Sequence, residues 1–231
     1  PAAGESWIEA AIEGDDWAPD NRLPLVLRVA QRQSVLLMEE PAAFGLLPAA
    51  LQPAADPARS GIALSRDEPI DGNPPPTAVF ATSAADLAEG SPLWRYVEAG
   101  GRLVLLPDAR HGTPPAAPDG VELEAPFSNE DGAALLALEP DHPLFDALRE
   151  PSGAVPLERA LVRRGWTLSL SAPWRPLLGL EDGRPVLAER ALGSGRVVVV
   201  AFPFHPSWSS LPVHVAFVPL AHGLAAPRAA T

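Results

Sequence analysis

The chain has 231 residues, of which 47% are hydrophobic, and a formal net charge of -12 at pH 7. This composition excludes a disordered chain, since it holds enough apolar residues for a large core, and it argues against nucleic acid as a partner, since phosphate binding relies on clustered cations. The chain has no Cys, which excludes disulfides, thiolate nucleophiles and cysteine metal sites.

Residues 1–32 differ from the rest of the chain. They contain two short strand candidates, around Trp7 and over Leu23–Val29, joined by an acidic turn. Two short strands do not bury a face alone. The turn carries Asp15, Asp16 and Asp20, but it lacks the glycine and terminal Glu of a calcium-binding EF-hand loop, so we interpret it as a solvated turn.

From residue 33 the pattern alternates between strands and helices. The expected strands cover Ser34–Glu40, Gly61–Ser65, Thr77–Thr82 and Arg102–Pro107, and the expected helices cover Ala42–Leu51 and the stretch after Ser91. The second helix has Ser91 as its N-cap, Pro92 at its first position and a glycine pair at its end. Alternation of this kind favours a mostly parallel sheet that is covered on both faces.

After the proline-rich loop Thr113–Asp119 the pattern becomes antiparallel. We expect a short helix after Glu139 and strands over Val155–Val162, Trp174–Leu180 and Pro185–Leu192. The apolar run Val197–Phe202 is typical of a strand buried on both faces. Pro203 and Pro206 then take the chain out of the sheet, because proline cannot donate to a ladder.

Ligands of an open α/β sheet favour the crevice beyond the carboxyl ends of its strands. The side chains that we expect at this edge are Glu39, Ser83, Asp108, Arg110, His111, His205 and Trp208. Asp108 and His111 have the chemical types of an acid-oriented general base, and Arg110 could bind an anion; hydrogen bonding within the loop and a salt bridge are the simpler interpretations.

Other catalytic patterns are weaker. Ser83 lies in Ala-Thr-Ser-Ala-Ala, and Ser194 lies between two glycines that indicate a hairpin turn, so neither matches the strained G-x-S-x-G turn of a hydrolase elbow. The histidines show no metal spacing such as H-E-x-x-H, so we predict neither a metal nor another cofactor. They lie at the following positions: His111, His142, His205, His214 and His222.

Three tryptophans bear on the crevice and the core. We expect Trp94 and Trp174 to be core residues. Trp208 lies in the Ser/Pro loop after the last strand, where its indole would either plug the crevice or line it. Plugging is the preferred interpretation, because large aromatic side chains bury most of their area.

The segment Gly193–Pro212, followed by Phe217-Val-Pro-Leu, resembles the C-terminal part of the class I glutamine amidotransferase-like domain of BatA-type, membrane-anchored bacterial proteins. The resemblance implies a flavodoxin-like α/β fold: a mostly parallel sheet with helices on both faces and an antiparallel hairpin extension. It also implies that residues 1–32 are the last strands of a preceding β-sandwich or a linker, and that 33–231 form the amidotransferase-like domain.

Class I amidotransferases carry a cysteine nucleophile at the turn that Asp108 occupies here. We therefore expect a non-catalytic domain that acts as a protein-interaction or scaffold module, with an unidentified protein partner. The alternatives are a small-molecule-binding domain that uses the crevice and a hydrolase without cysteine. No stretch approaches the ~20 apolar residues of a membrane span, so we expect a soluble piece of a longer protein, extracytoplasmic by the resemblance and attached to the membrane through other segments.

Overall fold

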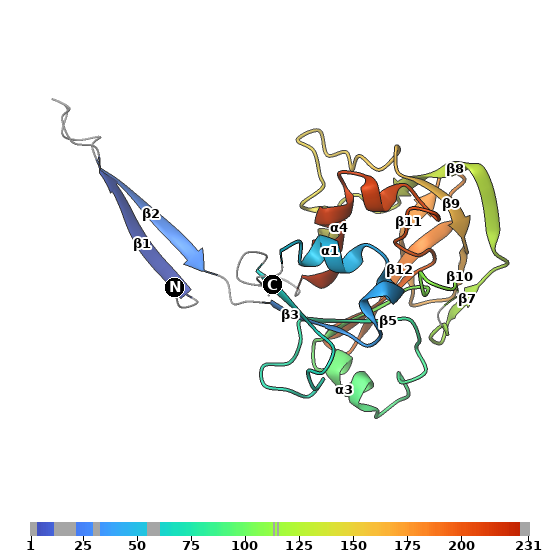
Figure 1. Cartoon of the computed structure of the whole chain (residues 1–231), viewed down its shortest axis with the longest axis horizontal. Helices are drawn as coiled ribbons and strands as arrows, with labels where there is room; N and C mark the ends of the chain where they lie inside the picture. Colours follow the sequence, from blue (N-terminus) through green and yellow to red (C-terminus); the bar gives the residue numbers. More distant parts are fainter. Residues whose placement is uncertain are drawn as a thin grey trace. The chain divides into compact units, whose positions relative to one another are not determined.

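The computed structural model describes residues 4–11, 22–29, 33–54, 61–112, 114 and 116–226. The chain divides into two compact units, Pro1–Arg32 and Gln33–Thr231 (Figure 1). The acidic turn with Asp15, Asp16 and Asp20 lies outside the described residues.

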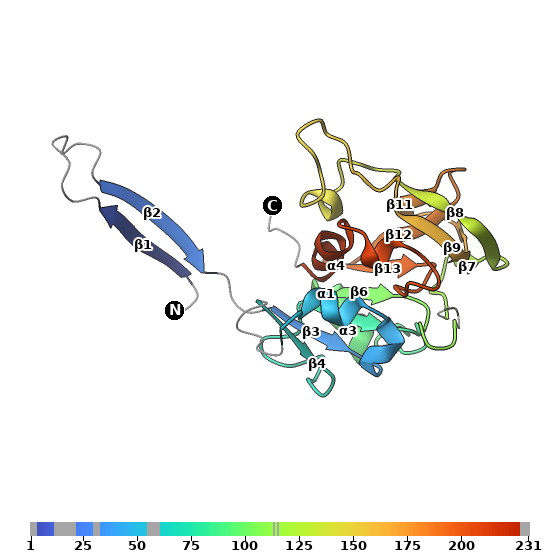
Figure 2. The same cartoon turned by 45° about the horizontal axis from the view of Figure 1, so that its top comes forward.

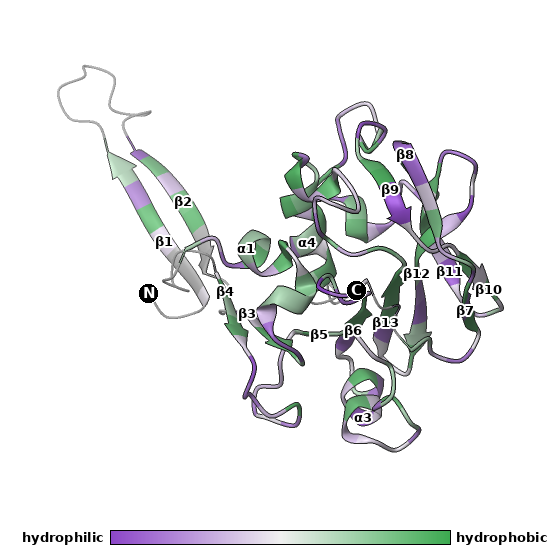
Figure 3. Ribbon diagram, turned by 45° about the vertical axis from the view of Figure 1, so that its right-hand side comes forward, coloured by the Kyte–Doolittle hydropathy of each residue, from purple (hydrophilic) through white to green (hydrophobic). Residues whose placement is uncertain are grey.

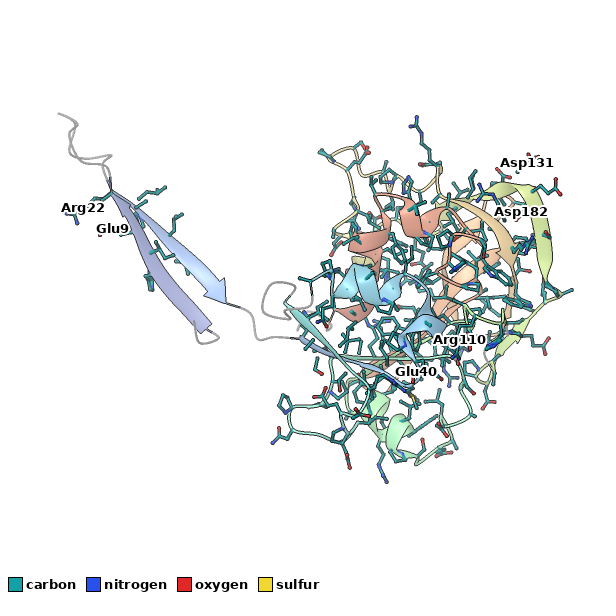
Figure 4. The ribbon with its side chains drawn as sticks, in the orientation of Figure 1. Glu9, Arg22, Glu40, Arg110, Asp131 and Asp182 are labelled. Carbon is teal, nitrogen blue, oxygen red and sulfur yellow. The ribbon has the colours of Figure 1, made fainter. Side chains whose placement is uncertain are left out.

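The first unit is an antiparallel hairpin of β1 (Gly4–Ala11) and β2 (Arg22–Val29). Trp7 and Ile8 point to opposite faces, because successive strand residues alternate, and both are exposed, at 75% and 46%. An ion pair between Glu9 and Arg22 joins the two strands at 3.3 Å (Figure 4). A hairpin with apolar residues uncovered on both faces is only marginally stable in water. That it belongs to a β-sandwich stays a prediction.

The second unit contains a mixed sheet of nine strands within the described residues. β4 lies at one end of the sheet, and β8 and β9 lie at the other (Figure 2). In spatial order the strands are β4 (Ile62–Ser65), β3 (Gln33–Leu37), β5 (Ala78–Ala81), β6 (Arg102–Leu105), β13 (Gly195–Val200), β12 (Pro185–Leu192), β11 (Arg175–Leu180), β8 (Phe127–Ala137) and β9 (Leu161–Gly165). A separate antiparallel pair is formed by β7 (Val121–Leu123) and β10 (Leu168–Leu170).

Short helices cover parts of both faces. α1 and α4 pack together on one face and α3 lies on the other (Figures 1 and 3). The helices are η2 (Pro41–Phe44), α1 (Leu47–Leu51), α3 (Pro92–Glu98), η3 (Pro143–Phe145), η4 (Leu211–Val213) and α4 (Phe217–Ala225). In the described part of the chain, no helix is long and apolar enough to cross a membrane.

The expected flavodoxin-like fold with a mostly parallel sheet is wrong. The pairs from β4 to β13 are parallel, but those from β13 through β12, β11 and β8 to β9 are antiparallel. The antiparallel strands are therefore half of the sheet rather than an extension at its edge. The helices between strands are also too few and too short for a flavodoxin-like layer on each face.

Two expected elements differ from the structure for local reasons. The helix over Ala42–Leu51 is broken into η2 and α1, because Gly45 adopts a φ of 61° and a Cβ atom there would lie 2.1 Å from the carbonyl oxygen of Phe204. The strand over Val155–Val162 begins only at Leu161. By contrast, Ser91 caps α3 as predicted, its hydroxyl accepting a hydrogen bond from the Trp94 amide at 3.0 Å.

The core is densest around β13. Val197 through Val200 are buried, as the apolar run predicts, and the aromatic rings of Phe202, Phe204 and Phe217 follow one another at centroid distances of 5.9 Å and 5.3 Å. Figure 3 shows hydrophobic residues along the central strands. These rings join the end of β13 to α4.

A buried charge cluster lies across the central strands. Glu189 on β12 accepts a hydrogen bond from His142 at 3.0 Å and forms an ion pair with Arg196 on β13. The Leu144 amide donates to Nδ1 of His142 at 3.2 Å, so Nε2 carries the ring hydrogen that goes to Glu189. Arg196 lies opposite Arg102 on β6, and Arg102 donates to the Gly223 carbonyl of α4 at 2.6 Å.

The pKa of Glu189 is set by opposing effects. Burial raises it, but the hydrogen bond from His142 and the charges of Arg196 and Arg102 outweigh burial, and the pKa lies below its ordinary value. Because the folded pKa is the lower one, the ionised group stabilises the fold above the unfolded pKa and this contribution is lost as the pH falls.

Replacing Glu189 by Gln should lower the free energy of unfolding at pH 7 by on the order of 2 kcal/mol, because the partly buried Arg196 and His142 lose their charged hydrogen-bond partner. Urea unfolding measures this loss. The difference from wild type should shrink as the pH falls below the ordinary glutamate pKa of about 4.3. Glu181→Gln, at an exposed position, is the control and should change little; an equal loss in both variants would contradict the assignment.

Candidate functional site

The loops that follow β3, β5, β6 and β13 carry the seven predicted site residues. The parallel pairing of these strands brings their carboxyl ends to one edge of the sheet. We call this the carboxyl edge. The side chains there are held in three local groups, described in turn.

Glu39 joins β3 to β5. Its carboxylate accepts hydrogen bonds from the Thr82 amide at 3.1 Å and from the Thr82 hydroxyl at 3.0 Å. β3 has β4 on one side and β5 on the other, so the order of the strands reverses between β3 and β5. This is the topological switch point, where α/β sheets bind ligands, and the Glu39–Thr82 pair lies there. In this protein the hydrogen bonds of the Glu39 carboxylate hold the loop after β3 and the loop after β5 together.

Asp108 is held by the loop that it begins. Its carboxylate receives the Arg110 amide at 2.8 Å and the Arg110 guanidinium at 2.6 Å, and the ring of His111 lies 3.4 Å away. The loop is closed by a hydrogen bond from the Gly112 amide to the Asp108 carbonyl at 2.7 Å. The expected salt bridge of Arg110 is therefore present within the loop.

The side-chain hydrogen bond from Arg110 is the largest effect on the pKa of Asp108, which it lowers from 3.8 to about 2 against a rise from burial. The Arg110 amide, His111 and the Arg110 charge lower it further by smaller amounts. The carboxylate is ionised at every physiological pH. Its contribution to stability is fully present at neutral pH and is lost as the pH falls from about 4 to about 2. A carboxylate with so low a pKa is too weak a base to accept a proton at pH 7.

Arg110 is surrounded by further acids. The hydrogen bond to Asp108 raises the pKa of Arg110 above its ordinary value, and the charges of Asp108, Glu40 and Glu39 raise it further. Figure 4 shows the side chains of Glu40 and Arg110 near each other. Glu40 also forms an ion pair with Arg66 at 2.7 Å. The guanidinium is thus surrounded by carboxylates, which disfavours an anionic ligand there.

Trp208 covers the Asp108–Gly112 loop. A Cβ atom on Gly112 would lie 2.3 Å from the Trp208 ring, so the indole rests directly on this glycine. Its other neighbour is Trp166, whose ring stacks on it with centroids 5.6 Å apart. The Trp208 carbonyl accepts the Arg163 amide at 2.7 Å, which fixes the loop to β9. These contacts agree with the interpretation of Trp208 as a plug.

The last two predicted residues have local roles. Nδ1 of His205 lies 2.7 Å from the Ser207 hydroxyl and accepts the Ser207 amide at 3.2 Å. The Ser83 hydroxyl accepts the Ala85 amide at 3.1 Å. Both are turn contacts, and in the described part of the chain neither side chain hydrogen-bonds to Asp108 or His111.

The arrangement offers little chemistry. No group of three or more His, Asp or Glu side chains in the described residues could hold a metal ion, and His214 lies outside the helix that contains His222. Trp174 is buried, and Trp94 is partly buried against the core. What remains at the carboxyl edge is a set of closed turns.

A cavity at the opposite edge was not predicted. It has a volume of about 500 Å³ and lies between α3 and the loop that precedes β5, at the amino ends of the strands. The sequence signals were present in Asn73-Pro-Pro-Pro and in the glycine pair after α3, both of which shape its wall. On their own, these signals indicate only a proline-rich loop and a helix end.

Comparison with known proteins shows the fold alone. No family model and no curated protein matches the chain. The cytoplasmic protein STM3548 from Salmonella typhimurium has a similar structure, with 12% identity and a TM-score of 0.54 over 95% of this chain and 94% of that one. Two other structures are less similar. The cytoplasmic protein STM1381 from Salmonella typhimurium LT2 has 12% identity and a TM-score of 0.48 over 96% of this chain and 93% of that one. The β-galactosidase from Rahnella sp. R3 has 16% identity and a TM-score of 0.43 over 75% of this chain and 29% of that one.

Replacing Gly112 by Ala should destabilise the fold through the contact with Trp208. Gly112 has a φ of 61°, and Gly90 has a φ of 77° with nothing within 4 Å of its Cβ position. Gly90→Ala therefore carries only the backbone strain of about 1 kcal/mol, whereas Gly112→Ala adds an overlap worth about 1–3 kcal/mol. Urea unfolding gives the difference, and near-ultraviolet circular dichroism reports the loss of the Trp166 stack. Equal losses would show that the indole is not seated on the loop.

Proposed function

We propose that residues 33–231 form a non-catalytic module that binds another protein. The observation that carries the proposal is an exposed apolar surface beside the plugged carboxyl edge. It consists of Val213, Val215 and Val218, which are 71%, 84% and 50% exposed. We call it the valine surface. Three large apolar side chains within six residues of sequence are typical of a protein contact rather than of free surface.

The valine surface rests on a rigid support. Phe217 packs its ring 5.3 Å from that of Phe204, directly beneath the start of α4. The Phe204 carbonyl accepts the amide of Leu46 at 2.9 Å, and Leu46 is itself 37% exposed. A partner that covers the valines would therefore meet ordered backbone and lose little entropy in binding.

The contacts of the carboxyl edge support the same proposal. A cysteine nucleophile is excluded by composition. The acid at the matching turn, Asp108, is occupied by Arg110, and the crevice expected for a small ligand is covered by Trp208. The resemblance to the amidotransferase-like domain of BatA-type proteins supports an extracytoplasmic place in a membrane-anchored protein as part of this proposal.

Photocrosslinking tests the interaction. With p-benzoylphenylalanine at Val215 of the full-length gene product in its own cells, we expect a discrete adduct with another protein. The same probe at Asp182, an exposed turn residue remote in sequence (Figure 4), should give none. Val218→Glu should abolish the adduct, because burying a charge against an apolar partner is costly, while the melting temperature stays unchanged. Adducts of equal strength at both positions, or an adduct that survives Val218→Glu, would contradict the proposal.

The hydrolase alternative has one observation behind it, the contact of the Ser207 hydroxyl with His205. We expect no hydrolysis of a broad panel of esters and amides by the wild type, because no carboxylate orients the exposed His205 ring in the described structure. Ser207→Ala and His111→Ala are the matched variants. Turnover by the wild type that either substitution reduces at least tenfold would establish an enzyme and end the non-catalytic proposal.

A further inference from the structure

The cavity of about 500 Å³ at the amino edge of the sheet is a second site, distinct from the valine surface. Its walls are one side of α3 and the loop Ile70–Thr77. Small-molecule sites in proteins fall in the range of about 300–1,000 Å³. The volume is thus sufficient for a ligand of about 15–25 non-hydrogen atoms.

The cavity is poor in hydrogen-bond donors. Pro75, Pro76 and Pro92 line it and have no backbone N–H. The other lining amides largely donate inside the protein: Thr77 to Ser34, Gly72 to Pro69, Arg95 to Ser91, Ala99 to Arg95, Gly100 to Val97 and Gly101 to Tyr96. A ligand that needs donors from the wall would find few.

Tyr96, the one aromatic side chain of the wall, already has hydrogen-bond partners for its hydroxyl within the protein. The Tyr96 hydroxyl accepts the Arg102 amide at 3.2 Å, and the Pro76 carbonyl lies 3.0 Å away as its acceptor. Its burial raises the pKa of Tyr96 to about 12, so the phenol stays neutral. Gly101 touches the ring, since a Cβ atom there would lie 2.3 Å from it. Tyr96 therefore offers a ligand only the apolar part of its ring.

The two charged side chains of the wall are exposed. Asp71 and Arg95 line the cavity, and both are exposed to solvent. Opposite charges at exposed positions are screened by water and select weakly between ligands. The buried part of the wall, Pro76 and Tyr96, selects by shape and apolar area.

We propose that this cavity binds an uncharged, largely apolar small molecule with a ring system. Its body packs against the prolines, Ala99 and the Tyr96 ring, and its polar end, where it has one, lies in water between Asp71 and Arg95. Burial of apolar surface is the source of affinity. Binding therefore depends little on salt and carries a negative heat-capacity change.

Titration with N-phenyl-1-naphthylamine, an uncharged two-ring fluorescent probe, tests the site. We expect saturable binding at one site per chain and a rise in melting temperature with probe concentration. Ala99→Phe should fill the cavity and weaken binding at least about tenfold. Ala99→Ser leaves the space open, and Glu98→Phe adds the same ring at a neighbouring exposed position that does not line the cavity; both should bind within about twofold of wild type.

The charge variants test the class of ligand. Arg95→Gln and Asp71→Asn should each leave the probe affinity within about twofold, as should raising the salt from 50 to 500 mM. The anionic relative 8-anilino-1-naphthalenesulfonate should bind no more tightly than the uncharged probe. If the anionic probe binds more tightly than the uncharged one, and Arg95→Gln abolishes this difference, the site binds anions and the proposal of an uncharged ligand is wrong. Unchanged probe binding in Ala99→Phe, with an unchanged melting temperature, would place the probe elsewhere and overturn the site.

Discussion

Strand β13 is the constraint on which the rest of the structure depends. It pairs in parallel with β6 on one side and antiparallel with β12 on the other, so the two halves of the mixed sheet meet along it. Its valines are buried, which a strand with sheet on both sides and helices above and below requires. The loop that carries His205 and Trp208, and the aromatic contacts that support α4, follow from where this strand ends.

The buried charges reinforce the same junction. Arg102, Arg196 and Glu189 lie on the three adjacent strands β6, β13 and β12. Two arginines side by side would repel each other, and the carboxylate of Glu189 offsets that repulsion. A buried ion cluster is weak evidence for stability in itself, because desolvation is costly. Its position across the junction indicates instead that it fixes which strands meet there.

The sequence predicted the strands with strong patterns and missed those without them. The run Val197–Phe202 and the capping signals around Ser91 are local, and both were confirmed. β8 was missed because its first half, Phe127-Ser-Asn-Glu-Asp-Gly, is polar and lacks a regular alternation. It forms a strand through its pairing with β9 and β11, which no local pattern in the sequence indicates. With β8 unrecognised and β9 predicted to begin too early in the sequence, the antiparallel half of the sheet looked like a small addition.

The candidate site shows the same limit. Its residues could be assigned to one edge from the order of strands, and Arg110 pairs with an acid there as the simpler interpretation expected. The seating of Trp208 on Gly112 joins positions far apart in the sequence and left no local signal. The cavity at the amino edge was missed because the rule for α/β sheets directs attention to the other end of the strands.

The turn before β13 lies at the amino edge, against the end of α3. Gly193 and Gly195 leave no room for a side chain, since Cβ atoms there would lie 2.5 Å from the Glu98 carbonyl oxygen and 2.0 Å from that of Val97. The Ser194 amide also donates to the Glu98 carbonyl at 2.9 Å. The last turn of α3 thus packs directly against the first residues of β13 and the turn that precedes them. A displacement of that helix would therefore have to move the first residues of β13 or break these close backbone contacts.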